Sequence, residues 1–402
     1  MSIFATRLTS KMEKIFNNTE VAFALKNDTE LKKAYFLFKL ISKQSLVKIG
    51  TSLAHFAINS KLPVKGLIKS TVFDHFCGGV NEQDCLQVVD KMYTKGVSSV
   101  LDYSVEGKET EEQFDATLAM TLRTIEFAKE KQAIPFAVFK PTGVGRFYLF
   151  EKKGENLPFT ESEQQEWDRI INRFDKICSY AHQLDVMILI DAEHSWMQDA
   201  ADELVLDMMR KYNKEKCIVF NTAQTYRWDR YDFVKKVHLI GLQEGFHTGF
   251  KVVRGAYMEI ERQRAAEKGY PSPICATKAQ TDATFNKTAA YIIDNLDNKM
   301  AIFAGSHNEE SNEMLIEKMR QQNISHNDDR VWFGQLYGMS DNISYNLAKH
   351  QYNVSKYLPF GPVYDVVPYL IRRAEENTSV AGQTNRELDL IVTEIKRRRR
   401  NR

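Results

Sequence analysis

One segment near the C-terminus places charged and aromatic side chains at helical spacing. Residues 357–377 read YLPFGPVYDVVPYLIRRAEEN, in which Tyr369, Arg372, Arg373 and Glu376 fall at i, i+3, i+4 and i+7. This spacing puts the four side chains on one broad helical face. Adjacent guanidinium groups offer forked donors that suit a carboxylate or a phosphate. The alternative, surface pairing with the following glutamates, is worth only about 0.3–0.5 kcal/mol per pair and leaves the flanking tyrosines unexplained.

Short apolar runs must position the other polar residues. Eight runs follow one another, at 98–104, 134–140, 186–191, 217–223, 250–256, 299–305, 331–336 and 352–360. Continuous apolar runs are typical of a parallel sheet buried on both faces. Segments with helical periodicity separate them, one of which begins with a capping box at Thr160 and Glu163. The alternation predicts an α/β fold, a closed (β/α)8 TIM-type barrel. A doubly wound open sheet is the alternative, but the chain lacks its usual Gly-rich nucleotide loop.

Nearly every predicted strand ends in a polar or aromatic residue. In such barrels the chemistry lies at the carboxyl ends of the strands. Any one of these residues alone is more often a helix cap or a structural contact, but eight ends in register predict a functional mouth. With Arg372, Arg373 and Glu376 of the C-terminal segment included, five cations face four acids, which favours an anionic ligand. The residues are Asp102, Glu106, Lys140, Asp191, Gln224, Lys251, Arg254, Tyr257, His307, Asn308, Gln335 and Tyr357.

The composition sets limits on the class of protein. The chain has 402 residues, 43% hydrophobic and 27% charged, with a net charge of +2, so nothing points to nucleic acid. Five scattered cysteines without a C-x-x-C predict neither a disulfide framework nor a zinc site and favour a reducing compartment. The histidines lack metal-ligand spacing, and no G-x-S-x-G motif occurs. No run is long and apolar enough to span a membrane.

We expect three parts along the chain: an N-terminal helical arm (1–95), the barrel (96–377), and a C-terminal helix with a basic tail (378–402). In the tail, Leu388, Ile391, Val392 and Ile395 form an apolar stripe before KRRRRNR. One interpretation is a helix docked on the barrel with a disordered basic end. The other is a contact with an anionic membrane surface. Residues 1–16 also suit a weak mitochondrial transit peptide, although such amphipathic starts are common.

Five motifs together resemble the proline dehydrogenase family. They are ILIDAE (188–193), FKVVRGAY (250–257), AGSHN (304–308), FGQLYGM (333–339) and the 357–377 segment, and the likeness runs in order from about residue 71 to about 380. The resemblance is to the monofunctional enzymes. It implies an FAD-dependent barrel that oxidises L-proline to Δ1-pyrroline-5-carboxylate and passes electrons to a membrane quinone. It also implies the cytoplasm, peripheral to the inner membrane, in a bacterium, or the mitochondrial matrix and inner membrane in a eukaryote.

The resemblance assigns roles to individual residues. Arg372 and Arg373 would grip the proline carboxylate with help from Lys140, while Asp191 organises the charged network and Glu106 or Glu376 closes the site. Leu336, Tyr357 and Tyr369 would pack around the pyrrolidine ring. With Asp191, Arg372 and Arg373, Lys251 is counted among the catalytic residues. The expected FAD contacts are Gln224, Lys251, Val253, Arg254, Gly255, Ala256, Tyr257, Lys278, Ser306, His307 and Glu376; no metal is expected.

Two other hypotheses remain open at this point. One is a dehydrogenase for hydroxyproline or another cyclic imino acid on the same scaffold. Tyr357 argues against it, because a bulky ring at this position would crowd a 4-hydroxyl group. The other is a barrel without catalysis that serves as a binding or membrane scaffold, which the complete set of strand-end residues disfavours.

Overall fold

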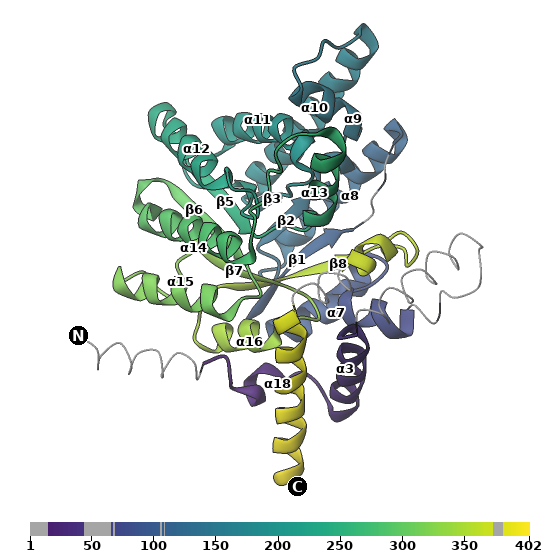
Figure 1. The fold of residues 1–402 in the computed structure, drawn as a ribbon, viewed down its shortest axis with the longest axis vertical. Helices are drawn as coiled ribbons and strands as arrows, with labels where there is room; N and C mark the ends of the chain where they lie inside the picture. The colour runs from purple at the N-terminus through teal and green to yellow at the C-terminus, as the bar shows by residue number, and fades with distance from the viewer. Residues whose placement is uncertain (1–14, 44–65, 67–68, 105–106, 108, 373–380) are drawn as a thin grey trace. The chain divides into compact units, whose positions relative to one another are not determined.

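A computed structural model describes residues 15–43, 66, 69–104, 107, 109–372 and 381–402. Eight strands form a closed barrel in chain order (Figure 1). Their bounds are β1 Val97–Tyr103, β2 Phe136–Phe139, β3 Met187–Ile190, β4 Val219–Gln224, β5 Thr248–Val253, β6 Met300–Gly305, β7 Val331–Leu336 and β8 Val354–Phe360. Each expected strand is confirmed, and the largest error is at β5, which ends at Val253 instead of 256. The (β/α)8 barrel fold is therefore confirmed.

The chain divides into two compact units, of which one is Val100–Gly334 and the other holds the remaining residues. In the first unit, helices cover the outside of the strands (Figure 1). The expected capping box of Thr160 and Glu163 is present at the start of α10. The helices are α8 Glu111–Glu130, α9 Phe147–Gly154, α10 Glu161–Leu184, α11 Ser195–Tyr212, α12 Arg230–Glu244, α13 Met258–Lys268, α14 Lys278–Asp294 and α15 Glu309–Gln321, with 3-10 turns at Pro141–Gly143 and Leu296–Asn298.

Aromatic rings from alternate strands pack together in this unit. Phe136 of β2 meets Phe220 of β4 and Phe303 of β6 edge to face, with ring centroids 5.8 and 5.2 Å away. Such layers, built from every second strand, fill the interior of a (β/α)8 barrel. Glycines leave room for the rings, since a Cβ at Gly249 would lie 2.8 Å from Phe220. The packed rings fill the barrel interior and so help to fix the strands that carry the polar residues.

The second unit contains β8 and the helices from both ends of the chain. These are α2 Thr19–Ala22, α3 Asp28–Ile41, a π-helical turn Lys69–Phe73, α6 Asp74–Phe76, α7 Glu82–Tyr93, α16 Asp341–Lys349 and α18 Ala381–Arg400. A further helical segment is described from 367 to 372, where the sequence predicted a helix. Asn27 caps α3 through a capping box with Glu30, which explains why the helix begins there.

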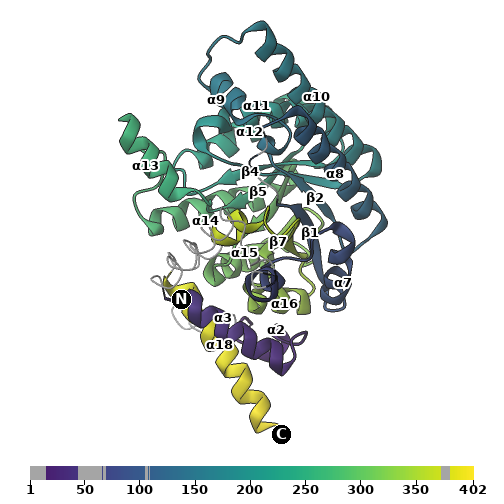
Figure 2. The same ribbon diagram turned by 90° about the vertical axis from the view of Figure 1, so that its right-hand side faces the viewer.

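The C-terminal helix differs from its expected form. α18 packs along α2 and α3, as Figure 2 shows, and Leu388, Ile391 and Ile395 of the predicted stripe join a cluster with Leu31 and Phe38 of α3. The helix thus docks on the arm, and its apolar stripe faces protein. The expectation of a disordered basic end is wrong, because the helix continues to Arg400. Arg397 and Arg398 pair with Glu394 inside the helix, and Arg398 also reaches Asp28 at 3.0 Å.

Two further expectations concern the whole chain. Within the described ranges, no helix has the length and apolar character that a membrane span requires. The five cysteines are buried, and none of them forms a disulfide within the described residues. Residues 1–14, where a transit peptide was considered, lie outside the described residues.

Candidate active site at the strand ends

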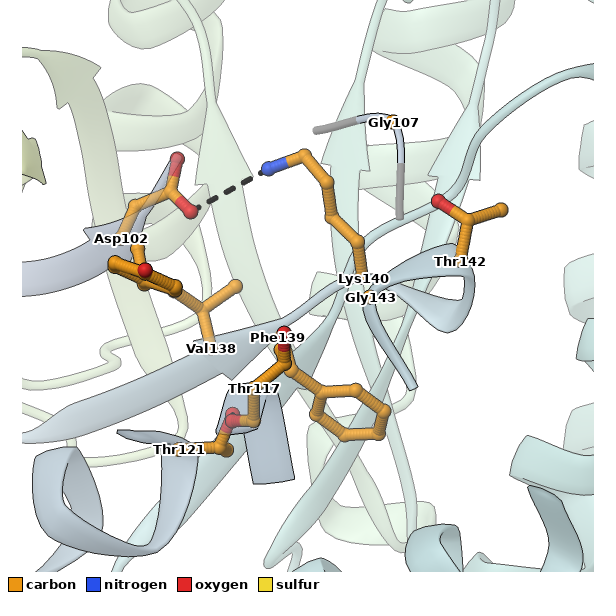
Figure 3. A pocket seen from close by; sticks show the side chains of 10 residues that line it. Asp102, Gly107, Thr117, Thr121, Val138, Phe139, Lys140, Thr142 and Gly143 are labelled. Atoms are coloured by element: carbon orange, nitrogen blue, oxygen red, sulfur yellow. Dashed lines mark hydrogen bonds and ion pairs between the residues drawn. The ribbon is translucent and has the colours of Figure 1, made fainter. Parts of the chain in front are cut away.

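Four charged side chains alternate in sign at the ends of β1, β2, β3 and β5. The Lys140 ammonium lies 3.4 Å from an Asp102 oxygen and 3.5 Å from an Asp191 oxygen, and Lys251 pairs with the other oxygen of Asp191. Figure 3 shows Lys140 extending its side chain toward the Asp102 carboxylate. The set holds two ammonium groups and two carboxylates. It is therefore balanced in charge and presents both signs to a ligand.

Strand register brings these residues together. Phe139 of β2 pairs with Ile190 of β3, so the next residues, Lys140 and Asp191, leave their strands side by side. The Asp191 amide donates to the Phe139 carbonyl at 3.0 Å, which extends the ladder by one step. Burial alone would raise the pKa of Asp191, but the ammonium groups of Lys251 and Lys140 outweigh burial and lower it. Asp191 is thus held ionised between two cations.

Two acids that were not assigned roles support this cluster. Asp102 is buried and accepts a hydrogen bond from the Ser104 hydroxyl at 2.7 Å, which fixes its carboxylate. Glu193 accepts from the amide and the hydroxyl of Thr142, at 3.0 and 2.7 Å, and so pins the turn that follows Lys140. Asp102 was already among the strand-end residues of the mouth predicted from the sequence, although it was given no role of its own. The reach of Glu193 depends on side-chain direction, for which the sequence carries no signal.

A small pocket opens beside Lys140, between β1, β2 and the first half of α8 (Figure 3). Polar and apolar groups share its lining. The side chains around it are those of Asp102, Tyr103, Thr117, Thr121, Val138, Phe139, Lys140 and Thr142, with Gly107 and Gly143. The charged cluster therefore borders this pocket.

A second polar group follows β5 and β6. The Arg254 guanidinium donates to Asp282 at 2.7 Å, to the Ser306 hydroxyl at 3.0 Å and to the Ser311 hydroxyl at 2.9 Å. Lys278 pairs with the same Asp282 at 2.6 Å. The structure thus joins two of the residues expected to contact FAD, Arg254 and Lys278, through the Asp282 carboxylate, which the sequence analysis overlooked, and links Ser306 to them through Arg254. Lys278 and Asp282 are spaced i, i+4 on α14, a signal that could have identified the pair.

These surroundings suit a large polar cofactor such as FAD. Gln224 is buried, and its amide nitrogen donates to the Glu193 carbonyl at 2.7 Å. Its amide oxygen is a buried acceptor without a partner among the described residues, as expected where a ligand donor belongs. Gly255 has a φ of +129°, and a Cβ there would lie 2.6 Å from the Tyr226 ring. Val253, Ala256, Tyr257 and His307 are partly exposed after the same strands. The residues present fit the cofactor.

The expected pyrrolidine contacts lie in the second compact unit. Leu336 packs against an apolar cluster that includes Tyr369 and Met339, so two of the three are brought together. Tyr357 is buried in β8, and its carbonyl accepts a hydrogen bond from the Tyr337 amide at 2.8 Å. Arg372 is half-buried. Arg373, Glu376 and Glu106 lie outside the described residues, so their roles stay predictions.

A buried ionic network in that unit was not anticipated. Lys356, fully buried in β8, pairs with Asp341 at 2.8 Å and donates to the Met339 carbonyl at 2.6 Å. Lys26 of the N-terminal arm pairs with the other oxygen of Asp341 at 2.6 Å. Glu387 of α18 accepts from the Ser340 amide. Lys26 and Asp341 are 315 residues apart, and such distant partners leave no local pattern in a sequence.

No cluster of three or more potential metal ligands occurs in the part of the chain that the structure describes. A closed (β/α)8 barrel with paired carboxylates and lysines at its strand ends is the arrangement in which barrel enzymes carry their active sites. Comparison with known families makes the class specific. The proline dehydrogenase family model matches residues 85–386, which is 302 of the 402 residues, and the chain belongs to this family.

Individual relatives agree with the family assignment. The carbapenem antibiotics biosynthesis protein CarD of Pectobacterium carotovorum is 36% identical over 336 residues, 83% of this chain and 86% of CarD. Human mitochondrial proline dehydrogenase 1 is 41% identical over 244 residues, which cover 60% of this chain and 41% of the human protein. The chain thus spans most of CarD but less than half of the human relative.

A solved structure supports the fold alone. The crystal structure of proline utilization A from Bdellovibrio bacteriovorus, inactivated by N-propargylglycine, superposes with a TM-score of 0.73 at 19% identity. The superposition covers 94% of this chain and 42% of that one.

Proposed function

We propose that the protein oxidises L-proline to Δ1-pyrroline-5-carboxylate with FAD as the first electron acceptor. The observation that carries the proposal is the alternating cluster of Asp102, Lys140, Asp191 and Lys251 at the barrel mouth, in a chain of the proline dehydrogenase family. A cluster with both signs of charge suits a zwitterionic amino acid better than a simple anion. It can meet the carboxylate with an ammonium group and the amine with a carboxylate.

Binding of the carboxylate is assigned to Lys140 together with Arg372 and Arg373. Lys140 is held between two carboxylates at 3.4 and 3.5 Å, which limits the positions that its ammonium group can adopt. Asp191 pairs with Lys140 and Lys251 at the same time. This double pairing supports its proposed role as the residue that organises the charged site. Leu336, Tyr357 and Tyr369 would cover the apolar ring and exclude water. The task of these residues is to fix the orientation of the substrate.

FAD, when bound, supplies the acceptor for the hydride that proline loses. We assign its anionic pyrophosphate to the region of Arg254, Lys278 and Ser306, where two cations flank the start of α14. The open acceptor of Gln224 would meet a donor on the polar edge of the flavin. Val253, Gly255, Ala256, Tyr257 and His307 would line the rest of the cofactor, as expected from the sequence.

The final acceptor is proposed to be a membrane quinone, with the enzyme peripheral to the membrane. Several relatives carry the word mitochondrial in their names, including the human and Dictyostelium discoideum proteins. The proposal therefore places the protein at the inner membrane, on the matrix side in a eukaryote and on the cytoplasmic side in a bacterium.

The test is an anaerobic titration of the purified protein, followed by its visible absorbance. We expect flavin bands that bleach on addition of L-proline and an equal yield of Δ1-pyrroline-5-carboxylate, trapped with o-aminobenzaldehyde. Bleaching by 4-hydroxyproline but not by proline would move the assignment to the alternative imino-acid substrate. Protein that stays colourless after reconstitution with FAD would refute the proposal and favour the scaffold hypothesis.

A further inference from the structure

One face of α3 is exposed, apolar and basic at the same time. Lys32, Lys33, Phe36, Lys39 and Leu40 are all exposed. Positions 32, 36, 39 and 40 are spaced i, i+4, i+7 and i+8, and residue 33 lies beside them, so the five share one face of the helix. Phe36 is 63% exposed and Leu40 39%. We call these five residues the α3 outer face; Lys43, also exposed, follows just beyond the helix end.

The opposite face of α3 fixes this orientation. Leu31, Ala34 and Phe38 are buried in a cluster with residues of α2 and α18. The helix is anchored along its length by that cluster and by the capping box at its start. The exposure of Phe36 is therefore a consequence of the packing of α3, because turning the ring inward would expose Phe38 instead.

The charge around the α3 outer face is positive. No acidic residue occurs between positions 31 and 43. The two acids of the first turn are engaged, Glu30 with Lys91 at 3.6 Å and Asp28 with Arg398 at 3.0 Å. The lysines are thus left to attract an external anion.

An aromatic and an aliphatic side chain among lysines on one helix face are typical of binding to an anionic lipid surface. The ring inserts at the level of the headgroups, and the lysines stay in contact with the phosphates. A protein partner would need a complementary surface that is both acidic and apolar. A lipid surface requires only the two properties that the face has.

We propose that the α3 outer face docks the protein on membranes that contain anionic phospholipid. The purpose of this docking rests on the proposed function, since a quinone in the membrane must be reached by a protein whose described helices do not cross it. The apolar stripe of α18 is covered by α2 and α3, so the exposed apolar surface that could enter lipid is on α3 and not on α18.

The experiment measures cosedimentation of the full-length protein with vesicles. One preparation contains phosphatidylcholine with phosphatidylglycerol, and the other contains phosphatidylcholine alone. We expect binding to the first that weakens as salt is raised, and little binding to the second. A Lys32→Gln/Lys33→Gln/Lys39→Gln variant should bind about 100-fold more weakly, at roughly fivefold per lysine. Phe36→Ser/Leu40→Ser should lose most of its binding at every salt concentration.

A matched control is available on the barrel. Leu239 and Leu242 on α12 are 53% and 43% exposed and share a helix face, so Leu239→Ser/Leu242→Ser removes similar apolar area elsewhere. This variant should bind vesicles like the unsubstituted protein. All variants should keep their flavin content and their proline activity with a soluble dye acceptor, because none of the substituted residues is placed in the site.

The outcomes separate the two proposals. Vesicle binding that is unaffected by substitutions on α3, or equal on neutral vesicles, would overturn the docking surface and leave the proposed function intact. Normal binding in a protein without proline activity would overturn the proposed function and leave the surface intact. Self-association that Phe36→Ser/Leu40→Ser abolishes, without vesicle binding, would show that a second copy covers this face and would contradict the lipid assignment.

Discussion

The buried carboxyl of Glu387 should make the stability of the protein depend on pH. Glu387 lies on α18, and burial together with the nearby Asp341 carboxylate raises its pKa from 4.5 to about 7. Between these values the native state holds a proton that the unfolded chain has released. The group therefore contributes stability below pH 4.5, and this contribution is lost as the pH rises through 7. At 1.36 kcal/mol per pH unit, the total is about 3 kcal/mol.

The perturbation is Glu387→Gln, which cannot ionise but keeps an oxygen to accept the hydrogen bond from the Ser340 amide. Between pH 5 and pH 8 the free energy of unfolding of the unsubstituted protein should fall by about 2 to 3 kcal/mol relative to the variant. Urea unfolding at the two pH values, followed by tryptophan fluorescence, measures this difference. Comparison with the variant cancels the contributions of all groups that the two proteins share.

A second glutamate on the same helix provides the control. Hydrogen bonds from Arg397 and Arg398 overcome the effect of burial and lower the pKa of Glu394. Glu394→Gln should therefore destabilise the protein at neutral pH and gain nothing at pH 8. Parallel pH profiles for Glu387→Gln and the unsubstituted protein would refute the reasoning, because they would show that Glu387 ionises as easily in the folded protein as in the unfolded chain.

Two further predictions concern the site. Lys140→Met should raise the KM for proline by about 10–100-fold with little change in FAD content, because a hydrogen bond to a charged group is worth about 1.5–3 kcal/mol. Steady-state kinetics measure this change. As the control, Lys152→Met removes a lysine that pairs with Glu163 outside the proposed site and should leave the KM unchanged. Asp282→Asn should weaken FAD binding by about tenfold without changing the proline KM, because it removes the carboxylate that pairs with Arg254 and Lys278. Fluorescence titration with FAD measures the affinity. An unchanged affinity for FAD would exclude Asp282 from the cofactor site.

The barrel could be predicted from the sequence because its strands are continuous apolar runs bounded by polar residues. The proximity of strand-end residues such as Lys140 and Asp191 could also be predicted, because the carboxyl ends of the parallel strands of a (β/α)8 barrel lie at one face of the barrel. The partners of these residues could not be predicted. Which oxygen of Asp191 meets which lysine depends on side-chain directions that are decided by packing across three strands.

The ends of the chain were harder to interpret for a different reason. The stretch LKKAYFLFKLI has apolar residues on every side of the helix, so periodicity does not indicate which face is buried. The answer depends on α18, which lies about 350 residues further along the chain and covers Leu31 and Phe38. The basic tail was wrongly expected to be disordered, because its acidic partner Asp28 lies far away in the sequence, in the N-terminal arm. Long-range pairing of this kind becomes visible only in three dimensions.

The buried network around Lys356 connects these remote segments to the predicted substrate contacts. Neighbouring residues on a strand point to opposite faces, so a buried Tyr357 and a buried Lys356 serve different sides of β8. Lys356 donates to the Met339 carbonyl and pairs with Asp341, which fixes the turn that follows Leu336. An apolar residue of similar size would often be as stabilising as a buried ion pair, but it could not hold carbonyl oxygens in a set position. The charges at this turn are therefore better explained by positioning than by stability. By the same reasoning, the arm and α18, which supply Lys26 and Glu387 to this network, help to hold the turn after Leu336 in place.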